Sequence, residues 1–233
     1  MKHIIIVHGD KGGVGKTTVA GLAADYAVEK HGSVVVVEGD LKIGDIARRF
    51  RGVAGVQGLA VDLARPDGSE DAAVALFSEI EKIDADLVVI NTPASASLTI
   101  DRQADIIVPA AHSLGYAVHV AWLLGPGDDS ARLAGESQLC GLADRKVAIV
   151  NKAFGQTIAW AHHPARAAWL ESGGLEGELP VLSERTMAAV RDLPGRYSVI
   201  ANDPASLNTI QRSAVHRWVH ASWAAAIVPI FGE

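Results

Sequence analysis

A glycine-rich loop lies between an apolar run and a helical pattern near the N-terminus of this chain. The run His3–Val7 predicts a short buried strand, the loop follows it directly, and helical periodicity begins at Lys16. Because Gly12, Gly13 and Gly15 carry no side chains, backbone N–H groups can converge there on phosphate oxygens, and the helix N-terminus adds partial positive charge. The loop therefore predicts a phosphate site, with a chance glycine-rich turn as the alternative.

The side chains of this loop predict how a nucleoside triphosphate would be held. Lys16 would reach the β- and γ-phosphates, and the hydroxyl of Thr17 would ligate Mg²⁺. Since these groups act together with the backbone, the predicted nucleotide-binding set is a continuous stretch. Its members are Gly12, Gly13, Val14, Gly15, Lys16, Thr17 and Thr18.

The loop departs from the ordinary G-x-x-x-x-G-K-T pattern, which places glycine at position 10. This chain has Asp10 there, with Gly9 one residue earlier. In its actual form, KGGVGKTT from Lys11 to Thr18, it resembles the deviant Walker A loop of the ParA/MinD family of ATPases. The resemblance implies that Lys11 reaches across a nucleotide-sandwich dimer to the phosphates bound by the other subunit; a solvated loop lysine is the alternative. Asp10 would repel phosphate unless it is turned away or paired with a cation.

Short apolar runs rich in β-branched residues recur along the chain and predict buried strands. They are His3–Val7, Val34–Val37, Leu87–Ile90, Asp105–Pro109, Val147–Val150 and Tyr197–Ala201. The predicted helices between them include Lys16–Lys30, Ser69–Ile83 and Ser113–Leu124. Alternating strands and helices predict an α/β fold with a mostly parallel sheet, helices on both faces, and ligands at the carboxyl ends of the strands.

The family resemblance makes this α/β order the three-layer P-loop NTPase fold. The length of 233 residues suits one ATPase domain, 1–233. Within it, the weakly periodic segment 153–184 is a candidate for a variable or mobile excursion.

Two acidic residues, Glu38 and Asp40, follow the second predicted strand, where the ParA/MinD family usually has two aspartates separated by one residue. The resemblance implies that Asp40 positions the attacking water or accepts its proton, and that Glu38 helps to hold the Mg²⁺ shell. Plain loop acids at a strand end are the alternative. The predicted catalytic set is Lys11, Lys16 and Asp40.

Asn91 begins the segment Asn91-Thr92-Pro93-Ala94, which resembles the switch II segment of the family, where aspartate is usual. An amide can accept a hydrogen bond from metal-bound water, but it carries no charge to offset Mg²⁺. The predicted metal set is therefore Thr17, Glu38, Asp40 and Asn91, with slow hydrolysis. Two interpretations remain: a weak ATPase, which we favour, or a switch that binds nucleotide and dimerises with little turnover.

The residues after the predicted strand Val147–Val150, Asn151-Lys152-Ala153-Phe154, favour ATP over GTP. In an N-K-x-D sequence the aspartate would accept hydrogen bonds from guanine, and Phe154 removes that carboxylate. The family resemblance makes Asn151 a candidate contact to adenine, and an asparagine that caps a strand end is the alternative. The predicted cofactors are ATP and Mg²⁺.

The net charge and the C-terminal segment indicate whether DNA or a membrane could be a partner. The formal charge of −6 excludes a broadly cationic surface, so DNA binding would need a local patch, such as Arg48-Arg49-Phe50-Arg51, or a partner protein. The segment Ala205–Val228 predicts an amphipathic helix, and with only Arg212 and Arg217 as basic residues it favours core packing over membrane attachment. A single cysteine, Cys140, and the lack of a signal-like or membrane-spanning run predict a cytoplasmic protein.

Together these motifs predict an ATPase similar to the ParA/MinD family, with a plasmid stability or conjugation member of the StbB, TraL or VirC type as the finer resemblance. It would form an ATP-dependent homodimer and hydrolyse ATP slowly under stimulation by a protein partner. It would position or segregate a cargo such as plasmid DNA or a conjugation complex, with DNA bound directly or through a partner; membrane attachment is not expected. A metabolic P-loop kinase or amide-forming synthetase is the alternative from a different class.

Overall fold

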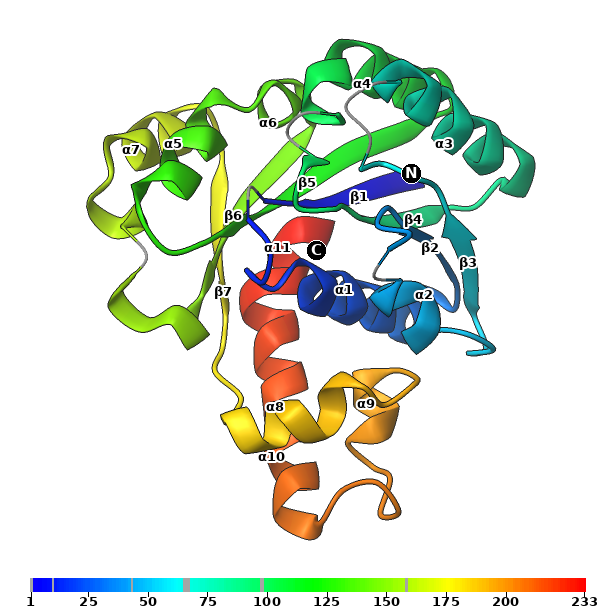
Figure 1. Ribbon diagram of the computed structural model, residues 1–233, viewed down its shortest axis with the longest axis vertical. Helices are drawn as coiled ribbons and strands as arrows, with labels where there is room; N and C mark the ends of the chain where they lie inside the picture. Colours follow the sequence, from blue (N-terminus) through cyan, green and yellow to red (C-terminus); the bar gives the residue numbers. More distant parts are fainter. Residues whose placement is uncertain (1, 10, 43, 65–67, 97–98, 158) are drawn as a thin grey trace.

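A seven-stranded sheet forms the centre of the protein, in the order β3-β2-β4-β1-β5-β6-β7, and every described pair of neighbouring strands is parallel (Figure 1). The computed structural model describes residues 2–9, 11–42, 44–64, 68–96, 99–157 and 159–233, so Asp10 lies outside the described residues. The strands are β1 (Lys2–His8), β2 (Val34–Glu38), β3 (Val56–Ala60), β4 (Leu87–Asn91), β5 (Tyr116–Leu124), β6 (Arg145–Asn151) and β7 (Leu175–Leu179). The predicted parallel α/β fold is confirmed.

Helices cover both faces of the sheet, because alternate residues of each strand point to opposite sides. In β1, Ile5 lies in one apolar core and Ile4 in the other. One face carries α1 (Lys16–His31), α2 (Asp45–Arg49), α8 (Glu184–Arg191), α9 (Tyr197–Ile200), α10 (Thr209–Ser222) and α11 (Val228–Phe231). The other face carries α3 (Ser69–Ile83), α4 (Ala104–Ser113), α5 (Asp128–Glu136), α6 (Gln138–Leu142) and α7 (Pro164–Glu171). The sheet is thus the middle of three layers.

The predicted helices Lys16–Lys30 and Ser69–Ile83 are confirmed as α1 and α3. The C-terminal segment is also helical: α10 continues through a π-helical turn, Trp223–Ile227, into α11. Its apolar side, including Trp218 and Trp223, is buried in the core, as expected. Among the described residues, no helix is both long and apolar enough to cross a membrane.

Three predicted elements are wrong. The runs Asp105–Pro109 and Tyr197–Ala201, expected as strands, lie in α4 and α9, and the expected helix Ser113–Leu124 is mostly strand β5. The buried residues of α4 recur at helical spacing, but this spacing is visible only over the whole helix and not within the shorter apolar run. They are Ala104, Ile107, Val108 and Ala111. Strand β5 lies between β1 and β6 and is covered on both faces, so apart from His119 its residues are mainly apolar and it lacks the alternation that identifies a strand.

The segment 153–184 supplies an edge of the sheet. It contains short 3₁₀ turns (Lys152–Thr157 and Trp160–His162), α7 and β7, which pairs with β6. Strand β7 has the sequence LEGEL, with little β-branched character. At Gly177 a Cβ atom would lie 2.9 Å from the carbonyl oxygen of Ala225, so the C-terminal helix approaches this strand too closely for a side chain. Packing against that helix, and not strand propensity, therefore accounts for β7.

Candidate nucleotide-binding site

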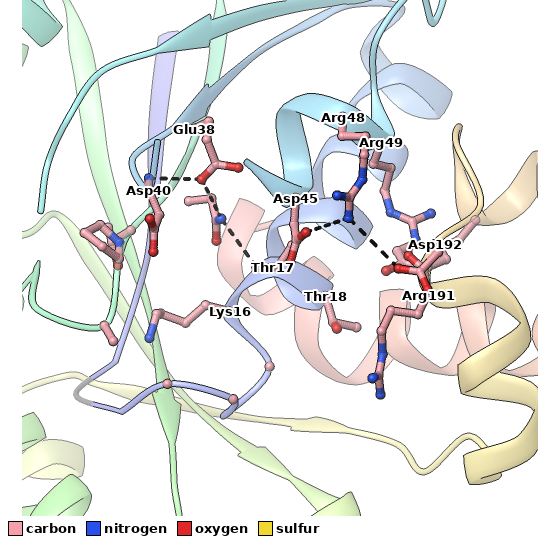
Figure 2. Close-up of a pocket in the computed structure, with 18 of the residues that line it drawn as sticks. Lys16, Thr17, Thr18, Glu38, Asp40, Asp45, Arg48, Arg49, Arg191 and Asp192 are labelled. Carbon is pink, nitrogen blue, oxygen red and sulfur yellow. Dashed lines mark hydrogen bonds and ion pairs between the residues drawn. The ribbon is translucent and has the colours of Figure 1, made fainter. Parts of the chain in front are cut away.

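The glycine-rich loop, the acidic residues and Asn91 meet at the carboxyl edge of the sheet. In the strand register, Asn91 of β4 lies opposite Val7 of β1 on one side and Glu38 of β2 on the other. A pocket opens at this edge, and the predicted residues that line it are Gly12, Gly13, Gly15, Lys16, Thr17, Thr18, Glu38, Asp40 and Asn91 (Figure 2). The structure thus brings together most of the predicted site.

The backbone of the loop needs glycine at two of its positions. Gly13 has φ 76° and Gly15 has φ 109°, both in the left-handed region that L side chains rarely adopt. At Gly15 a Cβ atom would also lie 2.9 Å from the side-chain nitrogen of Asn151. Because Gly15 directly precedes α1, its conformation sets how the loop enters the helix N-terminus.

The two lysines of the loop lie differently. Lys16, the first residue of α1, is buried, and its Nζ donates to the carbonyl oxygens of Gly9 at 3.2 Å and Lys11 at 2.7 Å. Its ammonium group therefore sits within the curve of the loop. The Nζ of Lys11 instead donates to the carbonyl oxygen of Pro126 at 3.3 Å, in the connection that follows β5. One lysine is held inside the loop and the other faces a neighbouring connection.

Glu38 is the most constrained side chain of the site, with 2% of its surface exposed. Its Oε1 accepts hydrogen bonds from the Asp40 N–H at 3.1 Å and from the Asn91 side-chain amide at 3.2 Å, and its Oε2 accepts from the Ile46 N–H at 3.0 Å. Burial raises the pKa of Glu38, and these hydrogen bonds oppose the shift. Its carboxylate therefore joins β2, β4 and α2.

Asn91 presents its side-chain nitrogen to the site, and not its oxygen. Its side-chain nitrogen also donates to the Thr17 hydroxyl at 3.4 Å, while its buried Oδ1 has no hydrogen-bond partner among the described residues. The Thr17 hydroxyl and the carboxylates of Glu38 and Asp40 are hard donors of the kind that Mg²⁺ takes, with phosphate and water supplying the rest, whereas the Asn91 oxygen is buried away from Thr17 and Glu38. No cluster of three or more His, Cys, Asp or Glu side chains in the described part of the chain could hold a metal ion unaided. The residues present fit Mg²⁺ that arrives with a nucleotide.

Asp40 lines the pocket beside Glu38, and its Oδ1 accepts a hydrogen bond from the Lys42 N–H at 3.1 Å. It is only partly buried, unlike Glu38. A carboxylate in this position is accessible to a water molecule in the pocket, as a general base requires.

Two predicted nucleotide-binding residues do not line the pocket. The side chain of Val14 is buried in the core. Asn151, at the end of β6, is 7% exposed; its side-chain amide donates to the carbonyl oxygen of Val14 at 3.0 Å and its Oδ1 accepts from the Ala153 N–H at 3.1 Å. Both polar groups of the Asn151 side chain thus bind backbone atoms. Through its bond to Val14, the side chain holds the phosphate loop in position.

The far wall of the pocket is formed by residues that the sequence did not predict to belong to the site. This wall consists of Asp45, Arg48 and Arg49 from α2, and of Arg191, Asp192, Leu193, Pro194 and Tyr197 from α8 to α9. Arg48 pairs with Asp45 at 2.7 Å and approaches Asp192 at 4.0 Å. The run Arg48–Arg51 is not a continuous basic surface, because Arg49 and Phe50 are buried. The basic run itself was the only signal of this wall in the sequence.

A buried histidine, also missed, lies beneath the loop. His8 ends β1, and its Nδ1 accepts a hydrogen bond from the Gly9 N–H at 2.7 Å. Burial lowers the pKa of His8 to about 4, so the ring is neutral at neutral pH. Its ring lies 4.7 Å from that of Trp122. Because the neutral imidazole of His8 accepts a hydrogen bond from the Gly9 N–H, it holds the first residue of the loop in position.

The chain matches no protein-family model and no curated protein. Among solved structures it is similar to the septum site-determining protein MinD from Pyrococcus horikoshii, crystallised with Mg-ADP, with a TM-score of 0.53 and 17% identity over 94% of this chain and 95% of that one. FtsY from Mycoplasma mycoides gives a TM-score of 0.49 with 14% identity, over 94% of this chain and 68% of that one. The signal recognition particle receptor FtsY from Elizabethkingia anophelis gives 0.48 with 17% identity, over 94% and 66%. The fold assignment rests on MinD: this chain has the three-layer P-loop NTPase fold.

Proposed function

We propose that this protein is an ATPase similar to the ParA/MinD family, which binds Mg-ATP, forms a nucleotide-sandwich dimer and hydrolyses ATP slowly. Its role would be to position or segregate a cargo such as plasmid DNA or a conjugation complex, with a protein partner that stimulates hydrolysis. The observation that carries the proposal is the convergence of Lys16, Thr17, Glu38 and Asn91 around one pocket at the carboxyl edge of the sheet.

Binding of a triphosphate follows from the loop. The ammonium of Lys16 now donates to two carbonyl oxygens of its own loop, and phosphate oxygens are stronger acceptors because they are charged. The N-terminus of α1 and the backbone N–H groups around Gly13 and Gly15 add positive potential at the same place. Lys16 therefore exchanges neutral acceptors for charged ones when nucleotide binds.

Hydrolysis needs a water aligned with the γ-phosphate and a base near it. Asp40 supplies the carboxylate on the exposed side of the pocket, whereas Glu38 is occupied with three N–H donors. Thr17, Glu38, Asp40 and Asn91 would hold Mg²⁺ and its water shell, and the ion would supply charge neutralisation to the phosphates. Because Asn91 brings no charge, the pocket offsets less of the metal's charge than an aspartate would, and turnover is slow.

The hydrogen bonds of Asn91 also favour a second candidate, a nucleotide-dependent switch with little hydrolysis. Its amide ties Glu38 to Thr17, so the site is assembled without a second carboxylate at position 91. Such a protein would bind Mg-ATP and dimerise, yet release phosphate at the rate of free ATP.

The decisive experiment measures molar mass by light scattering with Mg-ATP, Mg-ADP and no nucleotide, together with phosphate release. We expect a dimer with Mg-ATP alone, loss of that dimer in Lys11→Ala, and loss of nucleotide binding in Lys16→Ala. Lys82→Ala, an exposed lysine on α3, is the matched control. A molar mass that is the same with and without nucleotide, and the same in Lys11→Ala, would contradict the nucleotide-sandwich dimer.

Phosphate release then distinguishes the classes. A positioning ATPase should be stimulated by DNA or a partner protein, a metabolic enzyme by a small substrate, and a switch by neither. Release from wild-type protein that equals release from Lys16→Ala would exclude an ATPase.

A further inference from the structure

Arg49 joins the two parts of the far wall, the end of α2 and residues 190–197. Its side chain is 5% exposed, and its guanidinium donates to the carbonyl oxygens of Val190 at 2.9 Å, Arg191 at 2.6 Å and Gly195 at 3.2 Å. Val190 and Arg191 end α8, so a positive charge meets the negative end of that helix. The Gly195 N–H donates in turn to the Arg49 carbonyl oxygen at 2.6 Å. The two segments are tied by both backbone and side chain.

The same guanidinium lies on an aromatic ring at the edge of the pocket. The Cζ atom of Arg49 is 4.1 Å from the ring centroid of Tyr197, the first residue of α9. Burial raises the pKa of Tyr197, and the charge of Arg49 opposes this shift. Tyr197 and Thr18, which belongs to the predicted nucleotide-binding stretch, line the same pocket, so the stacked pair lies beside the phosphate loop.

A glycine in the middle of α1 makes room for this stack. At Gly21 a Cβ atom would lie 3.0 Å from Cε2 of Tyr197 and 3.7 Å from Cδ of Arg49. Glycine inside a helix is unfavourable compared with alanine. Its presence at this position is explained by the close approach of Tyr197 to the helix.

The other end of α2 is tied to the site as well. The Ile46 N–H, in the first turn of α2, donates to Oε2 of Glu38 at 3.0 Å. Since α2 spans only Asp45–Arg49, a displacement of Glu38 is carried to Arg49 within little more than one helical turn. The short helix therefore contacts the proposed Mg²⁺ ligand Glu38 at its start and residues 190–197 at its end.

We propose that Arg49 is a positioning residue that couples nucleotide in the pocket to the wall formed by residues 190–197. The inference rests on the proposed function, because it takes a nucleotide as the ligand. Nucleotide at the loop acts on this wall by two routes, through Glu38 and α2 and through Thr18 and Tyr197. Both routes converge on Arg49.

Hydrogen exchange in peptides covering 184–203 tests the coupling, with Mg-ATP and without nucleotide, alongside the affinity for a fluorescent ATP analogue. Arg49→Lys keeps the charge but loses the planar fork that reaches several carbonyls. The matched control is Arg51→Lys, because Arg51 is exposed two residues further along. We expect at least tenfold faster exchange at 190–197 in Arg49→Lys without nucleotide, loss of the protection that Mg-ATP confers there, and less than a fivefold loss of affinity.

Equal protection by Mg-ATP in Arg49→Lys and Arg51→Lys would overturn the coupling. Tyr197→Phe gives a second test, since it keeps the ring under Arg49 and removes the hydroxyl next to Thr18; protection by Mg-ATP should fall there by at least half while exchange without nucleotide stays unchanged. If wild-type protein binds no nucleotide, the proposed function fails. In that case, hydrogen exchange measured without nucleotide still tests whether Arg49 positions residues 190–197. Unchanged exchange in Arg49→Lys would show that it does not.

Discussion

The side-chain amide of Asn91 donates a hydrogen bond of 3.2 Å to the buried carboxylate of Glu38, across the parallel register of β4 and β2. A neutral donor at this position stabilises the charged form of Glu38, whose pKa burial raises. An aspartate in the same place would face that carboxylate as a like charge. Asn91 thus keeps the site assembled in the absence of a divalent cation.

This relationship predicts a metal-dependent penalty for Asn91→Asp. Without Mg²⁺ the variant should lose about 1–3 kcal/mol of unfolding free energy, because a hydrogen bond becomes a repulsion at a buried position. Mg-ATP should restore the stability, and phosphate release should rise about tenfold, the factor that corresponds to about 1.4 kcal/mol of transition-state stabilisation. Urea unfolding with and without Mg-ATP measures the first effect and a phosphate assay the second. Asn202→Asp, at an exposed asparagine, should show neither; a metal-independent loss in Asn91→Asp would contradict the argument.

A second prediction concerns the role of Asn151. Its amide holds the carbonyl oxygen of Val14, so Asn151→Ala should loosen the loop and weaken ATP and GTP binding by the same factor, about fivefold to tenfold for one hydrogen bond of about 1 kcal/mol. Competition binding with both nucleotides measures this. A loss confined to ATP would instead favour the adenine contact that the family resemblance implies.

A third prediction follows from the left-handed backbone at Gly15. Gly15→Ala should lower the unfolding free energy by at least about 1–2 kcal/mol, the cost of that conformation for a residue with a Cβ. The displaced loop should also lose nucleotide affinity, because Gly15 leads into Lys16. Gly58→Ala on β3, where a Cβ meets open space, should change stability by less than about 0.5 kcal/mol. Equal effects at the two positions would refute the requirement for glycine at 15.

A fourth prediction concerns pH. Burial lowers the pKa of His119 from 6.5 to about 4, and its Nδ1–H donates to the Ile230 carbonyl oxygen at 2.7 Å. The folded state therefore binds the proton more weakly than the unfolded state, so stability is full above pH 6.5 and falls as the pH drops toward 4. The loss should reach about 3 kcal/mol at 1.36 kcal/mol per pKa unit.

Urea unfolding across this pH range measures the effect on wild-type protein and on His119→Asn, which keeps an N–H donor near Ile230 but does not titrate. The variant should show a clearly shallower pH dependence. His216→Asn, at an exposed histidine on α10, should keep the full dependence. An unchanged slope in His119→Asn would contradict the assignment.

Local sequence was sufficient where structure and chemistry are set by neighbouring residues. The strand, the loop and α1 follow one another within His3–Lys30, and backbone conformation and helix dipole there depend on adjacent positions, so this part of the site could be predicted. The approach of Glu38 and Asn91 to the loop was also predictable, since parallel strands end at a common edge. Strand β5 was misread because a run buried on both faces has no period that distinguishes strand from helix, and Asp105–Pro109 was misread because five residues are too short to show the helical period of α4.

The parallel α/β order, the phosphate loop and the oxygen donors near it could be predicted from the sequence, because each depends on spacing within one or two elements. The far wall of the pocket could not, because it depends on tertiary packing. Arg49 and Tyr197 are separated by nearly 150 positions, and no local pattern distinguishes a buried arginine that binds carbonyls from one that faces solvent. Long-range packing settles that difference, because burying a guanidinium is favourable only where another part of the chain supplies the acceptors.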